Sequence, residues 1–315
     1  MNEQPFFSVF NHPAAQLAFA LLTGVVSWFV RGGFEKWPSL FRFFNFFQMQ
    51  CWRYLGKSEV VFLWCDDLDT KRNWLHSLRR KNIVRGHRKT KYVLLSEPKK
   101  ILQYPLPVKQ VPCIIFLDSD VTKFAMSPKQ RDAIEAHIKR YVTNGGVFFS
   151  SHDVLYRRVH NQDFCREVGY EINVFIRVQS PIKYQISKTS NLAEIFFSKI
   201  NIENDFELDD TEICYSNNPI DNFETITRIV LCWSDTNDVG VRVPLFFVKI
   251  LDKGLFFWIN SGDNGPRGQC PSLRVPDEKL VNIVSYIIKD REECLEILGT
   301  QQTVPGQHSE PVASE

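Results

Sequence analysis

The stretch SPKQRDAIEAHIKRYVTNGGVFFSSHD, residues 127–153, decides the fold class of this chain. Ser127 is a favourable N-cap, Pro128 suits the first helical position, and Gln130 is placed to close a capping box with Ser127. Apolar residues then recur at helical spacing, so the stretch predicts an amphipathic helix with one packed face. The apolar stripe consists of Ile134, Ile138, Tyr141 and Val142.

A glycine turn and a buried strand follow this helix. Asn144, Gly145 and Gly146 are residues that end helices, and residues 147–149 form the apolar run VFF. Such a run is typical of a parallel strand that is covered on both faces. The polar residues 150–153, SSHD, are therefore expected at the carboxyl end of a central strand.

The same alternation of strands and helices extends from Glu59 nearly to the end of the chain. We expect strands at 60–64, 92–95, 113–117, 172–178, 227–233, 245–251 and 255–260. We expect further helices from the acidic loop after Cys65 to about Arg80, and at 161–168, 192–200 and 277–289, with Asp69 or Thr70 capping the first of these. Residues 252–254 predict a hairpin turn. The pattern indicates an α/β, flavodoxin-like domain of three layers, with a mostly parallel sheet and a late antiparallel hairpin.

The N-terminal region contains a second strong signal. Residues 13–30 form an apolar run of eighteen residues without a charge, the shortest length that spans a bilayer. No basic segment precedes the run, whereas Arg31 and Lys36 follow it, so a retained anchor with the bulk of the chain in the cytoplasm is favoured over a signal peptide. The alternative is an apolar helix that is buried in the core or in an oligomer interface.

The segment after this run is rich in aromatic residues. Residues 37–54, WPSLFRFFNFFQMQCWRY, predict an interfacial or re-entrant element, or a helix packed on the soluble domain. We expect three regions: residues 1–57 with the anchor and the aromatic segment, the α/β domain at 58–298, and a disordered tail at 299–315. The resulting expectation is a single-pass membrane protein.

Charge and cysteine usage limit the classes of partner. Residues 71–91 carry nine Lys or Arg and no acid, so they are candidates for anionic lipid or a nucleotide, or form a solvated helix face. Nucleic acid is not favoured, because few aromatic residues lie among these charges. Eight cysteines without zinc-site spacing indicate buried thiols in a reducing compartment.

The order of elements resembles the class I glutamine amidotransferase-like fold, and most closely its ThuA-like branch. The resemblance covers about residues 60–288, and its most specific parts are SPKQRDAIEAHIKRYVTNGGVFFSSH and, at 253–265, KGLFFWINSGDNG. It implies chemistry at the strand end that bears His152. Amidotransferases carry a nucleophilic Cys at this place, whereas this chain has Ser150, Ser151 and His152 and no following glycine for an elbow. The resemblance therefore does not imply glutaminase activity.

Loops at the carboxyl ends of parallel strands converge on one crevice, which defines the candidate site. The candidate catalytic residues are His152, Asp66, Asp118 and Asp263, and the candidate ligand-binding residues are Asp67, Ser151, Asp153 and Asn264. Carboxylates near a histidine suit acid/base work or a hard divalent cation, although the same acids are also common helix caps. The sequence names no specific metal or cofactor.

Three functional hypotheses follow. The first is a membrane-anchored cytoplasmic module that binds a ligand or acts in assembly, including self-assembly into a homo-oligomer, and that lacks the catalytic Cys. The second is a metal-assisted hydrolase that uses His152 and the strand-end aspartates. The third is a membrane effector that senses a small signal.

Overall fold

The computed structural model describes residues 43–49, 51, 58–65, 67–85, 88–117, 127–155, 162–189, 191–216, 228–236, 240–261 and 271–299. The chain divides into two compact units, Met1–Gln48 with Gln103–Pro105, and Met49–Leu102 with Leu106–Glu315. In the first unit, residues 43–48 are helical, and four phenylalanines there are exposed. The predicted anchor at 13–30 lies outside the described residues. Within the described residues, no helix combines the length and the apolar character that a bilayer crossing requires.

The second unit is built on a ten-stranded sheet with the order β2-β3-β1-β4-β5-β12-β11-β10-β7-β8. Its strands are β1 (Ser58–Cys65), β2 (Val84–Arg85), β3 (Arg88–Leu94), β4 (Ile114–Leu117), β5 (Val147–Ser151), β7 (Ile182–Ile186), β8 (Phe206–Leu208), β10 (Arg228–Ser234), β11 (Pro244–Leu251) and β12 (Gly254–Ile259). A separate ribbon pairs β6 (Val174–Arg177) with β9 (Glu212–Tyr215).

The sheet is mixed, which corrects the expectation of a mostly parallel one. β3, β1, β4, β5 and β12 run parallel, whereas the pairings from β12 through β11, β10 and β7 to β8 are antiparallel, as is the pairing of β2 with β3. β7 was missed because its sequence IKYQI alternates buried and half-buried residues, a weaker signal than the fully buried run of β1. The predicted hairpin at 252–254 is confirmed.

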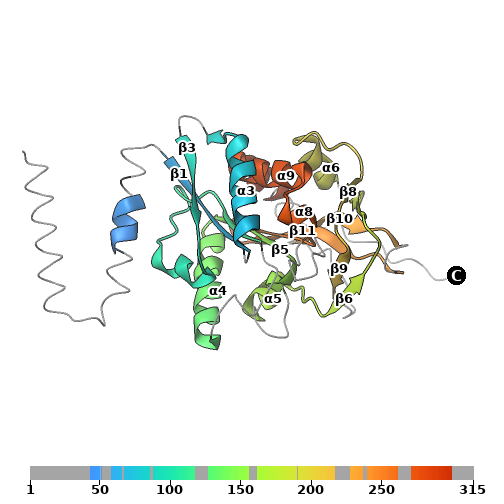
Figure 1. Ribbon diagram of the computed structural model, residues 1–315, viewed down its shortest axis with the longest axis horizontal. Helices are drawn as coiled ribbons and strands as arrows, with labels where there is room; N and C mark the ends of the chain where they lie inside the picture. The colour runs from blue at the N-terminus through green and yellow to red at the C-terminus, as the bar shows by residue number, and fades with distance from the viewer. Residues whose placement is uncertain are drawn as a thin grey trace, which may run out of the picture. The chain divides into compact units, whose positions relative to one another are not determined.

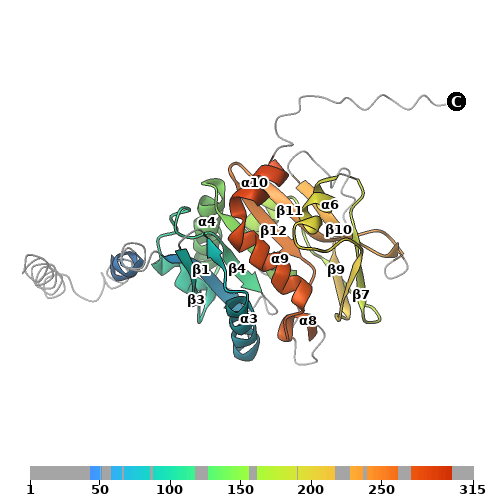
Figure 2. The same ribbon diagram turned by 90° about the horizontal axis from the view of Figure 1, so that it is seen from above.

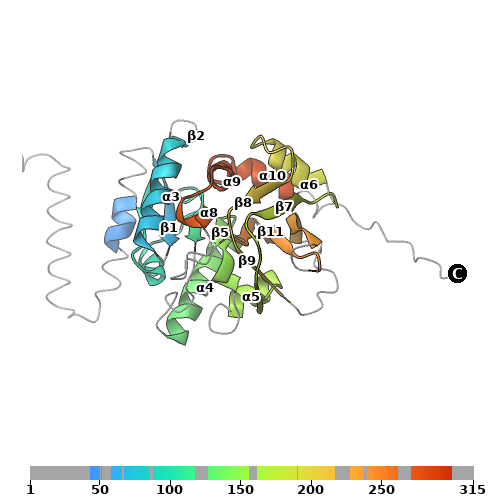
Figure 3. The ribbon, with the colours of Figure 1, turned by 45° about the vertical axis from the view of Figure 1, so that its right-hand side comes forward.

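Helices cover both faces of the sheet, so the expected three layers are present (Figure 1). The helical elements are α3 (Leu68–Arg80), η3 (Pro98–Gln103), α4 (Pro128–Thr143), η5 (His152–Leu155), α5 (Gln162–Val168), α6 (Asn191–Ser198), α8 (Pro271–Arg274), α9 (Glu278–Lys289) and α10 (Arg291–Gly299). α3, α6, α9 and α10 lie over one face, and α4 and α5 lie over the other (Figures 2 and 3). The sequence did not predict α10, which follows α9 after a single residue.

Aromatic rings hold the α4 side of the parallel strands together. Phe116, Phe148 and Phe256 occupy neighbouring strands, and successive ring centroids are 5.4 and 5.0 Å apart in edge-to-face contact. Such aromatic pairs add about 0.5–1.5 kcal/mol each beyond the area they bury. The apolar run of β5 is thereby fixed in the centre of the sheet, and the polar residues that follow it lie at the carboxyl end of this central strand.

The N-terminal caps of α4 and α3 agree only in part with the sequence signals. Ser127 caps α4, and its Oγ accepts the Gln130 backbone N–H at 3.3 Å. The Oε1 atom of Gln130 is buried and has no hydrogen-bond partner among the described residues, so the predicted capping box is half formed. The cap of α3 also differs from expectation. It is Asp67, whose side chain accepts the Thr70 N–H at 2.7 Å, and not Asp69 or Thr70.

Candidate functional site

The carboxyl end of β5 makes a sharp turn at His152. Ser150 is buried and donates its hydroxyl to the Phe257 carbonyl at 2.8 Å, which ties the end of β5 to β12. His152 then adopts a left-handed backbone with φ of 39°, and η5 begins at once. A left-handed non-glycine residue costs about 1–3 kcal/mol unless its surroundings hold it in place. Trp258 supplies such support, because its indole N–H donates to the His152 carbonyl at 2.9 Å. The chain therefore turns sharply from β5 into η5 although no glycine follows the strand.

The imidazole of His152 faces a carboxylate from the β6/β9 ribbon. Its Nε2 atom lies 3.3 Å from Glu212 Oε1, and the histidine side chain is 1% exposed. The ring of Phe175, on β6, lies 5.7 Å from the imidazole centroid. The ribbon thus contributes both a charged partner and an aromatic cover to His152.

Asn260, at the end of β12, places Glu212. Its Oδ1 atom accepts the Cys214 backbone N–H at 2.9 Å and the Cys214 thiol at 3.1 Å, and its Nδ2 atom donates to the Glu212 carbonyl at 2.9 Å. Asn260 is fully buried. One amide side chain therefore bridges two separate sheets and fixes the position of β9 beside the elbow.

A second carboxylate, Asp210, completes the site. It is fully buried, its Oδ1 atom accepts a hydrogen bond from Ser272, and Ser272 is 3.0 Å from the hydroxyl of Ser261. Burial raises the pKa of Asp210 to about 6, while the hydroxyl groups of Ser272 and Ser261 and the nearby His152 favour its charged form. Asp210 is thus a carboxyl group whose protonation changes close to neutral pH.

The short helix α8 carries Ser272, and two side chains of α3 donate hydrogen bonds to its backbone. Trp74 donates its indole N–H to the Leu273 carbonyl at 2.8 Å, and Asn73 donates to the Arg274 carbonyl at 2.9 Å. Helix α3 therefore contributes to the site through its contacts with α8.

Two buried oxygen atoms around His152 lack hydrogen bonds. Ser151 Oγ and Asp210 Oδ2 are buried and have no partner among the residues that the structure describes. Ser151 is opposite Ile259 in the parallel pair β5/β12, and Ser261 follows Ile259 by two residues, so both serines belong to the same face near the strand ends. We call this group the His152 cluster, and it consists of Ser151, His152, Asp210, Glu212, Ser261 and Ser272.

Of the predicted site residues, two belong to the His152 cluster, one lies elsewhere, and the others fall wholly or in part outside the described residues. His152 and Ser151 belong to the cluster, whereas Asp67 caps α3, and its bond from the Thr70 N–H lowers its pKa. Asp153 lies in η5, but its side chain is outside the described residues. The candidates Asp66, Asp118, Asp263 and Asn264 are also outside them.

The sequence analysis missed Asp210, Glu212, Asn260 and Ser272. The one local signal was the acidic pair at 209–210 between two short segments that contain apolar residues, FEL and EICY. Among the described residues, no group of three His, Cys, Asp or Glu side chains is arranged to hold a metal ion.

Two lysines of the basic stretch at 71–91 have partners in the second unit. Lys71 is buried, and its Nζ atom donates to the Leu95 carbonyl at 2.8 Å, while Lys81 pairs with Glu278 at 3.2 Å. Lys71 is therefore used inside the fold, whereas Lys81 makes an ion pair at the surface. The anionic partner of the remaining basic residues stays a prediction.

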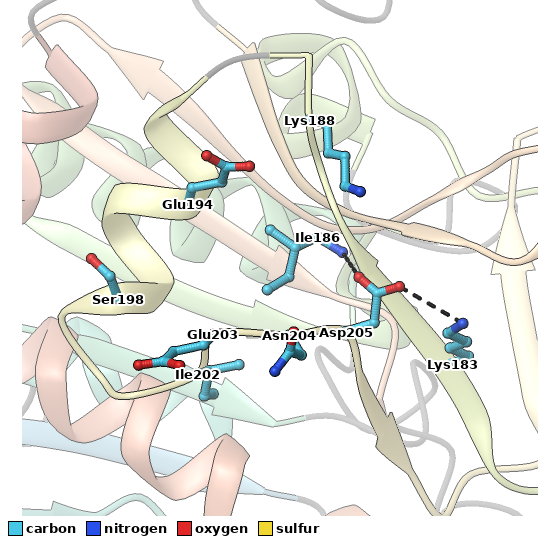
Figure 4. A pocket seen from close by; sticks show the side chains of 9 residues that line it. All are labelled: Lys183, Ile186, Lys188, Glu194, Ser198, Ile202, Glu203, Asn204 and Asp205. Atoms are coloured by element: carbon cyan, nitrogen blue, oxygen red, sulfur yellow. Dashed lines mark hydrogen bonds and ion pairs between the residues drawn. The ribbon is translucent and has the colours of Figure 1, made fainter.

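A separate hollow of about 660 Å³ lies between α6 and β7, on the antiparallel side of the sheet (Figure 4). Its lining residues come from α6, from β7 and the residues after it, and from the segment that leads into β8. They are Lys183, Ile186, Lys188, Glu194, Ser198, Ile202, Glu203, Asn204 and Asp205. None of them belongs to the His152 cluster.

No protein-family model matches the sequence, and no curated relative matches it. A solved structure of a ThuA-like protein from Bacteroides uniformis superposes with a TM-score of 0.51 at 12% identity, and the match covers 74% of this chain and 90% of that one. The fold is ThuA-like. A ThuA-like protein from Parabacteroides merdae (TM-score 0.47, 12% identity, 74% and 91% covered) and a cytoplasmic protein from Salmonella typhimurium LT2 (0.47, 11%, 73% and 98%) are also similar. At such identities the likeness concerns the ThuA-like fold alone.

Proposed function

We propose that this chain is a membrane-anchored module that binds a small ligand at the His152 cluster. The observation that carries the proposal is the pair of buried oxygens, Ser151 Oγ and Asp210 Oδ2, without hydrogen-bond partners among the described residues. A buried polar atom left unpaired costs about 1–3 kcal/mol. In native folds such groups are often found at catalytic sites or are completed by a bound water or ion.

The surroundings of these oxygens support binding. The cluster lies where strands β5 and β12 of the ThuA-like fold end, and open α/β sheets bind ligands at such edges. It combines a histidine, two carboxylates and three hydroxyl groups from β5, β9, α8 and the segments beside them. These groups can recognise a ligand that carries hydrogen-bond donors.

A binding role is favoured over glutaminase chemistry because the elbow presents His152 in place of a thiol. Burial raises the pKa of the thiols of Cys113, Cys232 and Cys294, so these cysteines suit packing and not nucleophilic attack.

The anchoring half of the proposal rests on the sequence of residues 13–30. Full-length protein expressed in cells should sediment with membranes and remain there after a high-salt wash, and detergent should release it. Recovery in the soluble fraction after salt alone would contradict anchoring.

The binding half is tested by thermal unfolding of the full-length protein against a panel of amines, amides, sugars and nucleotides. A ligand at 100 times its Kd stabilises a protein by about 2.7 kcal/mol. The panel should yield a compound that raises the Tm of the wild type but not that of the Asp210→Asn variant. Equal shifts in both proteins would exclude the His152 cluster as the binding site.

A hydrolase is the second candidate, because Asp210 has a pKa of about 6 and lies near His152. A carboxyl group that titrates near neutral pH beside a histidine suits general acid/base catalysis. Hydrolysis of p-nitrophenyl esters or glycosides, lost in both His152→Ala and Asp210→Asn, would support this reading. Turnover that survives both substitutions would count against it.

A further inference from the structure

The hollow between α6 and β7 has a defined structural origin. β7 pairs with β8 only as far as Tyr184 and Phe206, and the chain before β8 then diverges toward α6. Asp205 substitutes for the missing strand, because its Oδ1 atom accepts the Ile186 N–H at 2.9 Å. Its Oδ2 atom lies 3.7 Å from Lys183 Nζ, as the dashed lines in Figure 4 mark. Asp205 therefore fixes the strand wall of the hollow through one hydrogen bond and one ion pair.

The opposite wall is also fixed. α6 ends at Ser198, and Asn201 takes a left-handed backbone with φ of 58°. The Ile202 N–H donates to the Phe197 carbonyl at 3.0 Å, which closes the end of the helix. Residues 202–205 are thereby directed along the hollow, with Ile202 on the helix side and Ile186 near the centre (Figure 4).

The charges around the hollow are divided between its walls. Lys188 extends from the strand wall, whereas Glu194 on α6 and Glu203 on the connecting segment lie on the helix side (Figure 4). Lys183 and Asp205 pair with each other, but Lys188, Glu194 and Glu203 form no ion pair within the described part of the chain. One wall therefore offers a cation, the other offers two carboxylates, and isoleucine side chains lie between them.

We propose that this hollow binds a small zwitterion whose ammonium and carboxylate groups are separated by an apolar body, as in a dipeptide. The carboxylate would lie at Lys188, the ammonium at Glu194 on the opposite wall, and the apolar part over Ile186 and Ile202. The volume of about 660 Å³ falls within the range of roughly 300–1,000 Å³ that small-molecule sites occupy. The site is distinct from the His152 cluster and does not depend on the function proposed for that cluster.

Isothermal titration calorimetry of the full-length protein in detergent tests the proposal with three matched probes. These are the dipeptide alanylleucine, its N-acetyl derivative and its C-terminal amide. Alanylleucine should bind, and each blocked form should bind at least 10-fold more weakly. Equal affinity for all three probes, or no heat of binding from alanylleucine at about 100-fold molar excess, would overturn the proposal.

Two variants assign each charge to its partner. Lys188→Ala should bind alanylleucine and its amide equally, and Glu194→Gln should remove most of the difference between alanylleucine and its N-acetyl form. Asp132→Asn and Lys129→Ala change exposed charges on α4, over the other face of the sheet, and should bind like the wild type. Unchanged selectivity in both pocket variants would also overturn the proposal.

Discussion

The Nε2 atom of His152 lies 3.3 Å from Glu212 Oε1, although His152 directly follows β5, and Glu212 lies on β9, which belongs to a different sheet. The contact depends on Asn260, whose amide group bonds the backbone of β9 at Glu212 and Cys214. The histidine is brought into position by a left-handed turn, and the carboxylate by an amide bridge. Each half of the pair can therefore be perturbed separately.

Replacing Asn260 with alanine should disconnect β9 from the end of β12. The change removes buried hydrogen bonds to Cys214 and Glu212 and leaves their backbone groups unpaired, so we expect a loss of about 2–4 kcal/mol in the free energy of unfolding. Urea denaturation measures the loss. Asn144→Ala removes an exposed bond to the Arg140 carbonyl at 2.8 Å and should cost no more than about 1 kcal/mol. Equal losses in the two variants would contradict the bridging role of Asn260.

The buried carboxyl group of Asp210 should give the protein a measurable pH dependence. Its pKa rises from 3.8 to about 6 on folding, so the folded state binds the proton more tightly than the unfolded state. This contribution to stability is present at low pH and is lost as the pH rises through about 6, with a span of about 3 kcal/mol. Thermal unfolding between pH 4 and pH 7.5 should show this slope in the wild type but not in Asp210→Asn. An identical slope in both proteins would show that Asp210 does not titrate in this range.

Gly254 should not accept a side chain. A Cβ atom there would lie 2.0 Å from the Val142 carbonyl oxygen, where the hairpin meets the end of α4. Gly254→Ala should therefore destabilise the protein by at least about 1–3 kcal/mol. Gly240→Ala is the matched control, because Gly240 has a positive φ of 77° and no atom within 4 Å of its Cβ position. Gly254 itself has no positive φ, so an equal loss of stability in the two variants on chemical denaturation would contradict the explanation by close packing.

Asp67 should act as a helix cap and not as a site residue. Asp67→Ala removes the acceptor for the Thr70 N–H and should cost about 1 kcal/mol. Asp69→Ala affects only an exposed pair with Arg72 at 3.5 Å and should cost less than about 0.5 kcal/mol. Both variants should bind any ligand of the His152 cluster with wild-type affinity in calorimetry. Loss of binding in Asp67→Ala would return this residue to the site.

The fold followed from the sequence where a signal was local and strong. Capping residues and helical spacing predicted α4, and the uninterrupted apolar run predicted β5. The strands β7, β8 and β9 were not predicted, because all three are short, and β7 and β8 alternate buried with half-buried or exposed residues over few positions.

The site was only partly predictable for a related reason. His152 and Ser151 follow directly from the strand end, whereas Asp210 and Glu212 come from a segment whose position depends on β6 and Asn260. No local pattern encodes such long-range pairing. The left-handed backbone at His152 depends likewise on Trp258, which lies more than a hundred residues further along the chain.

The central claim is that the His152 cluster is arranged for a ligand and not for stability, and two neighbouring serines test it most directly. Ser150 donates to the Phe257 carbonyl, whereas Ser151 Oγ is buried without a partner among the described residues. In the ligand-free protein, Ser150→Ala should lower the free energy of unfolding by about 1 kcal/mol, and Ser151→Ala should raise it by about the same amount. Paired urea denaturation curves that show the two variants equally destabilised would contradict the account, because Ser151 would then be an ordinary part of the core.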